Sequence, residues 1–126
     1  MSAHQLFIHL AWTTRSRLPM IDSGTAAFLN EYFRKVLVEG KTELIGLAIL
    51  RTHVHMVVRL GPYYDLPRLV QQLKGGSSYE VNRLPGNILG LRWAKEYSAT
   101  TISPRRVPAA LRYLERQGEH HPGEAV

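Results

Sequence analysis

Two histidines separated by one residue, His53 and His55, stand inside an apolar run that continues to Val58. The run has the composition of a β-strand, in which successive side chains point to opposite faces of the sheet. The two imidazoles would therefore share one face, about 6–7 Å apart along the strand, where both can reach one metal ion. The alternative, two hydrogen-bonded histidines on a half-exposed sheet face, stays equally open on this spacing alone.

A tyrosine and a glutamine near the C-terminus form a second candidate pair. Tyr113 and Gln117 are four residues apart in a helical pattern, so their side chains lie on one face of that helix. The helical pattern by itself favours an ordinary amphipathic tyrosine at the edge of the core. His120 and His121, just beyond, could also ligate a metal, although paired histidines in a polar tail are more often exposed to solvent.

Basic and hydroxyl side chains supply candidate contacts to a polyanion. The stretch Gly75-Gly76-Ser77-Ser78 follows a lysine, but it is not a P-loop because the Gly-Lys-Ser/Thr order is absent. For any single arginine, solvated surface charge is at least as good an interpretation. We predict contacts to a nucleic-acid backbone from Arg15, Arg17, Lys74, Ser77, Ser78, Arg105 and Arg106.

Length and composition narrow the class of protein. The chain has 126 residues, which fits a single domain, 1–126, with a core of its own. Its 16 Lys and Arg against 10 Asp and Glu give a formal net charge of +6, which favours a nucleic-acid partner. The absence of cysteine excludes disulfide scaffolds, thiolate zinc sites and cysteine nucleophiles. No apolar run approaches the roughly 18–20 residues of a membrane span, so we expect a cytoplasmic protein without a membrane partner.

Periodicity and turn residues predict the elements that must position these side chains. Strands are expected at 6–13, 43–50, 53–60 and 93–102, and helices at about 25–39, from 67 to about 84, and from 103 to about 117. The first six elements follow the βαββαβ order of the ferredoxin-like sandwich, in which helices back a single sheet. We therefore predict an α+β fold of this kind, with an antiparallel sheet and an added C-terminal helix that carries the tyrosine.

These motifs occur together in an order that is typical of one family. The first strand ends in Thr13-Thr14-Arg15-Ser16-Arg17, and after it come His53-Val54-His55, Lys74-Gly75-Gly76-Ser77, Trp93 with Tyr97, and Tyr113 to Gln117 with His120-His121. In this order the chain resembles the single-tyrosine HUH transposases of bacterial insertion sequences and their REP-associated relatives, over about residues 4–121. The histidine pair alone is a weak motif, whereas the pair followed by a tyrosine–x–x–x–glutamine helix is much more specific.

The resemblance implies a transposase that cleaves and rejoins single-stranded DNA by metal-dependent transesterification, through a 5′-phosphotyrosine intermediate. Tyr113 would be the nucleophile, while His53, His55 and Gln117 would hold a divalent metal ion, Mg²⁺ or Mn²⁺. The family is typically dimeric, so a homodimer is expected, and its partner would be hairpin DNA at the ends of its own element. The short chain favours the insertion-sequence type over the REP-associated type.

Elementary chemistry agrees with these implied roles. A phosphodiester is anionic and resists attack, so a cation must partly neutralise it. A phenol is largely protonated near neutral pH and needs activation before it attacks. A histidine-triad hydrolase is excluded because Val57 stands where the third histidine would be. The remaining alternative is a non-catalytic nucleic-acid-binding module of the same fold, which would be a retired transposase.

Overall fold

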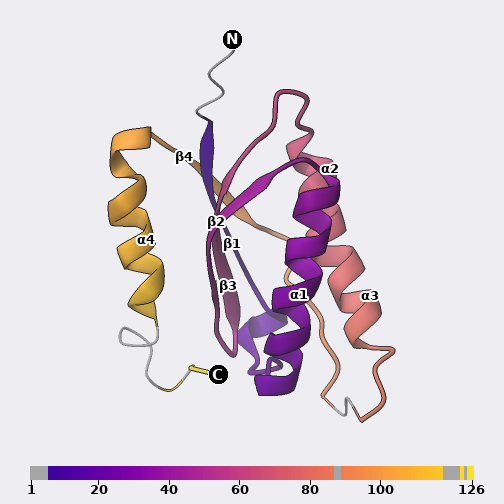
Figure 1. The fold of residues 1–126 in the computed structure, drawn as a ribbon. Coiled ribbons are helices and arrows are strands. Elements are labelled where there is room, and N and C mark those ends of the chain that lie inside the picture. The colour runs from indigo at the N-terminus through magenta and orange to yellow at the C-terminus, as the bar shows by residue number, and fades with distance from the viewer. Residues whose placement is uncertain (1–5, 87–88, 118–122, 124) are drawn as a thin grey trace.

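Four antiparallel strands form a single sheet in the order β2-β3-β1-β4 (Figure 1). The computed structural model describes residues 6–86, 89–117, 123 and 125–126. Its strands are β1 (Phe7–Thr13), β2 (Glu43–Ile49), β3 (His53–Arg59) and β4 (Ser98–Ile102). The two central strands, β1 and β3, pair so that Thr13 lies opposite His53 and Ala11 lies opposite His55.

Helices cover both faces of this sheet (Figure 1). One face carries α1 (Ser23–Glu39) and a second helical segment made of α2 (Leu66–Gln71), a π-helical turn (Gln72–Gly76) and α3 (Ser77–Val81). The opposite face carries α4 (Val107–Glu115), which follows a 3₁₀ turn at Pro104–Arg106. The predicted ferredoxin-like sandwich is confirmed, with α4 as the predicted addition. No helix in the part of the chain that the structure describes is long and apolar enough to cross a membrane.

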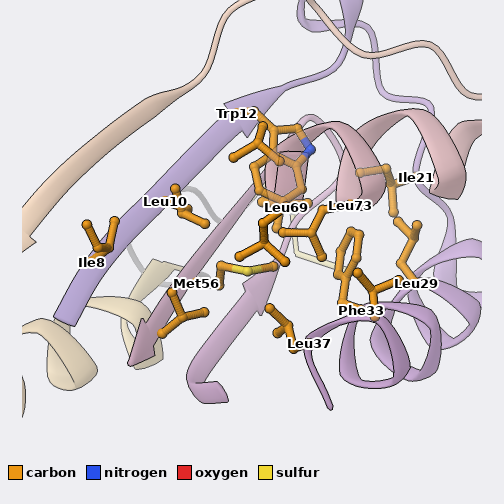
Figure 2. Close-up of a cluster of buried hydrophobic side chains, with 14 of the residues drawn as sticks. Ile8, Leu10, Trp12, Ile21, Leu29, Phe33, Leu37, Met56, Leu69 and Leu73 are labelled. Carbon is orange, nitrogen blue, oxygen red and sulfur yellow. The ribbon is translucent and has the colours of Figure 1, made fainter. Parts of the chain in front are cut away.

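The main core lies between the sheet and the α1–α3 layer (Figure 2). Ile8, Leu10 and Trp12 of β1 are buried there, because a strand sends every second side chain to the same face. The Trp12 ring meets the Phe33 ring of α1 edge to face, with the ring centroids 5.6 Å apart. Met56 of β3 joins the same cluster. The odd-numbered residues of β1 and β3 therefore face the other way, toward α4.

Aspartates cap the two helices of the core layer at their N-termini. The Asp22 carboxylate accepts a hydrogen bond of 2.7 Å from the Thr25 backbone N–H, and Asp65 accepts one of 3.2 Å from the Arg68 backbone N–H. The bond from Thr25 lowers the pKa of Asp22, because it stabilises the charged carboxylate. These caps begin α1 and α2 at defined residues, since each satisfies a helix N–H that has no partner within the helix.

The strand predicted at 93–102 is wrong in its first half. Regular pairing of β4 with β1 begins at Ser98, and Trp93 forms an isolated bridge with Thr14. Between these points, the backbone carbonyls of residues 94–96 accept hydrogen bonds from the Lys74 ammonium. The alternating sequence pattern continues through this segment, but its backbone carbonyls bind the Lys74 side chain instead of a neighbouring strand.

Helix α4 packs closely on the sheet because β2 carries a glycine beneath it. A Cβ atom at Gly46 would lie 2.5 Å from Cδ2 of Leu111 and 3.4 Å from Cδ2 of Leu114, both on α4. Leu114 is buried in this contact. The pairing of β2 with β3 also shifts register between Leu44 and Gly46. The missing side chain therefore sets how near α4, and the tyrosine on it, comes to the sheet.

We predict that Gly46→Ala destabilises the protein by about 1 kcal/mol, at the low end of the cost of overpacking, because the Leu111 methyl must move aside. Urea unfolding measures this change. Leu111→Ala provides the matched background, since it removes the obstructing methyl group. Gly46→Ala should cost less in that background than in the wild type. An equal cost in both backgrounds would show that Leu111 does not limit the approach of α4.

Candidate active site

His53 and His55 lie side by side on the α4 face of the sheet. Their ring centroids are 4.9 Å apart, and the rings are nearly perpendicular, at 87°. His53 is buried, and its Nδ1 lies 2.9 Å from the hydroxyl oxygen of Thr52. Because Nδ1 takes part in this contact, Nε2 is the nitrogen through which His53 could ligate an ion.

A third histidine, His9 of β1, belongs to the same group. Its Nε2 lies 3.0 Å from Nδ1 of His55, and the two ring centroids are 5.2 Å apart. Burial lowers the pKa of His9 below its ordinary value of 6.5, which favours the neutral ring. Sequence reasoning missed His9. Alternation along the first strand places it on the face away from the core, but only the register of β1 against β3 brings it to His55.

Tyr113 reaches this group from α4. Its ring lies edge-on to the rings of His55 and His9, with centroid distances of 5.7 and 6.0 Å. The side chain is 46% exposed, so a ligand in solvent has access to it while one side of the ring rests on the histidines. The structure therefore brings the strand pair and the helix residue together, although they are far apart in the sequence.

Gln117 lies one helical turn beyond Tyr113 and is 2% exposed. Its Nε2 donates a hydrogen bond of 3.3 Å to the Tyr113 carbonyl, whereas its Oε1 is buried with no hydrogen-bond partner among the described residues. An unpaired buried acceptor costs about 1–3 kcal/mol, so such an atom calls for an explanation. A cation that binds this oxygen would satisfy it.

The donor set of His53, His55 and Gln117 suits a divalent cation of the Mn²⁺ or Mg²⁺ type. Two neutral imidazoles and an amide oxygen are ligands that Mn²⁺ accepts, and they leave positions open for phosphate oxygens. Among the residues that the structure describes, no group of three or more His, Cys, Asp or Glu side chains is placed to hold a metal ion. A third protein ligand beside the two histidines would be the amide oxygen of Gln117. His120 and His121 lie outside the described residues.

A cleft of about 490 Å³ opens beside the histidines. Its lining includes His53, His55, Tyr113, Arg17, Glu96 and Tyr97. A second hollow, of about 420 Å³, lies between α1 and α2 and is lined by Tyr32, Glu39 and Asp65 among others. The first cleft is the candidate site, because it combines the imidazoles, a phenol and a cation, whereas the lining of the second contains no histidine.

The exposed arginines of the predicted nucleic-acid contacts fall into two groups. Arg15 and Arg17 form an exposed 3₁₀ turn directly after β1, and Arg17 lines the cleft. Arg105 and Arg106 are exposed in the turn that leads into α4, and they are not among the residues that line the cleft. Ser78 is half-buried, and its hydroxyl donates to the Gly75 carbonyl at 3.2 Å.

Lys74 and Ser77, which were predicted to contact phosphate, make contacts within the protein. The Lys74 ammonium donates to the carbonyls of Ala94, Lys95 and Glu96 at 2.7, 3.0 and 3.2 Å, and burial lowers its pKa. Two of these three residues, Ala94 and Glu96, line the cleft, so the hydrogen bonds from Lys74 stabilise this part of the cleft lining.

Ser77 is fully buried, which keeps its hydroxyl away from any ligand in solvent. The hydroxyl donates to the Lys74 carbonyl at 2.9 Å and accepts from Nε1 of Trp93 at 3.0 Å. The Trp93 ring in turn lies edge-on to the ring of Trp12, with centroids 5.8 Å apart. Through the Trp93–Ser77 hydrogen bond, the buried side of the α2–α3 helical segment is held against the start of the 93–97 segment.

Comparison with known proteins identifies relatives along nearly the whole chain. The sequence model of the family described as transposase, IS200-like, matches residues 2–117. The transposase TnpA of ISDra2 from Deinococcus radiodurans is 25% identical to this chain over 122 residues, which cover 90% of this chain and 85% of that protein. The matched range includes His53, His55, Tyr113 and Gln117.

Two solved structures share the fold. A candidate transposase from Deinococcus radiodurans R1 superposes with a TM-score of 0.70 at 24% identity, covering 92% of this chain and 93% of that one. A REP-associated tyrosine transposase, solved bound to a REP hairpin, superposes with a TM-score of 0.76 at 14% identity, covering 96% of this chain and 71% of that one. These likenesses establish the arrangement of the sheet and helices.

We predict that Lys74→Met loosens the 94–96 segment, because three carbonyls lose a charged donor. Amide hydrogen exchange should become faster at residues 95–97, and unfolding in urea should need about 1–2 kcal/mol less, since hydrogen bonds to charged groups are among the stronger ones. Lys35→Met is the matched control, because Lys35 is exposed on α1. Unchanged hydrogen exchange in Lys74→Met, together with weaker DNA binding, would contradict this role and support the predicted contact of Lys74 with phosphate.

Proposed function

Because this chain belongs to the IS200-like transposase family, we propose that it cleaves and rejoins single-stranded DNA through a covalent tyrosine intermediate. The observation that carries the proposal is the meeting of Tyr113 with His55 in a cleft that His53 also lines. One helical turn beyond Tyr113, Gln117 holds a buried oxygen that lacks a partner among the described residues. This arrangement supports a nucleophile beside two candidate metal ligands, with Gln117 as the proposed third ligand.

In the proposed reaction, the Tyr113 hydroxyl oxygen attacks the phosphorus of a DNA phosphodiester. The phenolic proton is lost to solvent or a base, a bond from phosphorus to the tyrosine oxygen forms, and the bond to the 3′-oxygen breaks. The products are a 5′-phosphotyrosine and a 3′-hydroxyl. Because the number of phosphoester bonds is conserved, the 3′-hydroxyl of another strand can reverse the step and join new ends.

The candidate residues in and around the cleft have separate tasks in this scheme. The imidazole rings of His9 and His55 support the tyrosine ring and restrict where its hydroxyl can point. A divalent ion, Mg²⁺ or Mn²⁺, held by His53, His55 and Gln117 would polarise the phosphodiester and partly neutralise its charge. Arg17, which lines the same cleft, attracts the phosphate backbone.

The proposed partner is single-stranded DNA that carries a hairpin end of the element. The net charge of +6 favours a polyanion, and Arg15, Arg105 and Arg106 are exposed for contacts to the backbone. The REP hairpin in the structure of the REP-associated transposase supports a folded DNA partner. We also propose a homodimer in which each Tyr113 serves the histidines of its own subunit, as the ring contacts within this chain support.

We predict that the protein forms a covalent adduct with labelled single-stranded DNA of its own element ends in the presence of Mn²⁺. A denaturing gel detects the adduct. Tyr113→Phe should abolish it, because the attacking oxygen is lost while the ring remains. Tyr97→Phe is the matched control, since Tyr97 lines the same cleft, and it should retain the adduct. Hairpin binding without any adduct in the wild type would instead indicate the non-catalytic binding module.

We predict opposite effects of Gln117→Met on the metal-free and metal-bound protein. Without metal, its stability in urea should equal or exceed that of the wild type, because the variant removes an acceptor whose burial costs about 1–3 kcal/mol when unpaired. With Mn²⁺, the stabilisation that the wild type gains should be largely lost, because one of three ligands is missing. Gln71→Met, on the exposed side of α2, serves as the control. Lower metal-free stability with unchanged Mn²⁺ affinity would make Gln117 a structural residue.

A further inference from the structure

We infer that His9 is a positioning residue that accepts a hydrogen bond from Nδ1–H of His55, and so holds His55 in the tautomer whose Nε2 can ligate a metal. The tautomer itself is a property of the metal-free protein. Its consequence for metal binding rests on the proposed function, in which His55 is a ligand.

The sheet brings His9 to His55 by a diagonal contact between neighbouring strands. His9 lies opposite Val57 in the pairing of β1 with β3, and His55 lies opposite Ala11, so the two histidines are offset by two residues on the same face. Aromatic side chains reach across such a diagonal. The distance of 3.0 Å between Nε2 of His9 and Nδ1 of His55 is that of a hydrogen bond, so one of the two nitrogens carries the hydrogen.

The direction of this bond decides what His55 can do. A neutral imidazole carries one hydrogen, so a hydrogen on Nδ1 leaves Nε2 as an electron-pair donor. If His9 donated instead, the hydrogen of neutral His55 would be on Nε2, and neither of its nitrogens would be available to an ion. Ligating histidines commonly donate their second ring nitrogen to a neighbouring acceptor, which fixes both tautomer and ring orientation.

His53 shows the same arrangement by a different partner. Nδ1 of His53 lies 2.9 Å from the hydroxyl oxygen of Thr52, which can accept the hydrogen on Nδ1. In the same way, Nε2 of His9 can accept the hydrogen on Nδ1 of His55. Both rings therefore turn Nδ1 toward the protein. The partner of His53 is its neighbour in the sequence, whereas His55 meets its partner, His9, on the central strand β1.

His9 has the properties of a support rather than of a group that meets the substrate. It is half-buried on a strand with neighbours on both sides, β3 and β4, and it is not among the residues that line the cleft. Its ring also lies edge-on to Tyr113, at 6.0 Å between centroids. One side chain is thus in contact with both the proposed nucleophile and a proposed ligand without lining the cleft.

The test is the tautomer of His55 in the metal-free protein, read from long-range ¹H–¹⁵N correlation spectra of histidine-labelled protein at a pH where the ring is neutral. We expect the hydrogen on Nδ1 in the wild type. A hydrogen on Nε2 overturns the inference without any variant being needed. This readout does not depend on DNA cleavage, so a missing tyrosine adduct would overturn the proposed function while leaving the His9 contact measurable.

Variants then separate the acceptor from simple packing. In His9→Phe, which keeps an aromatic ring but has no acceptor, His55 should become a mixture of tautomers, and Mn²⁺ affinity measured by calorimetry should fall at least about 10-fold. His9→Gln supplies an acceptor and should restore part of both. Thr100→Val, opposite His9 on β4, is the control and should change neither. An unchanged tautomer and affinity in His9→Phe would overturn the inference.

Discussion

The alternation of side chains along β1 and β3 is the constraint on which the rest of this structure depends. Even-numbered residues of both strands enter the core with α1–α3, and odd-numbered residues face α4. His9, His53 and His55 are all odd, so they meet on one face although they come from two strands. A shift of the pairing by one residue would send each histidine toward the apolar core, so the core that fixes the register also fixes the site.

Helix α4 and the residues that follow it complete the site by placing Tyr113 and Gln117 at different depths. Tyr113 is 46% exposed and remains open to a ligand, whereas Gln117, one turn later, is 2% exposed. Burial removes water from around the glutamine oxygen, which strengthens any interaction that the oxygen makes and raises the cost of making none. The close approach over Gly46 permits this depth, because a side chain on β2 would stand between the helix and the sheet.

Local patterns in the sequence were sufficient to predict the parts of the site that depend on local geometry. The i, i+2 spacing of His53 and His55 and the i, i+4 spacing of Tyr113 and Gln117 each follow from the geometry of one strand or one helix. His9 required the register of two strands, which no local pattern contains. The same holds for Lys74, whose charge suggested a phosphate contact but whose length and burial let it bind three backbone carbonyls. The break in the strand before β4 was also missed, because it depends on the contacts of Lys74 with residues 94–96 and not on a local pattern.

The two tryptophans of the chain, Trp12 and Trp93, are in ring contact at the cleft, where Trp12 is part of the lining. All of the intrinsic tryptophan fluorescence of this protein therefore originates from one spot, where the central strand meets the segment that Lys74 holds. Trp12 itself belongs to the cleft lining, and Trp93 is linked to Ser77 through its indole nitrogen. Fluorescence emission from this pair therefore reports changes in the environment of the cleft lining, without an attached dye or a change of sequence.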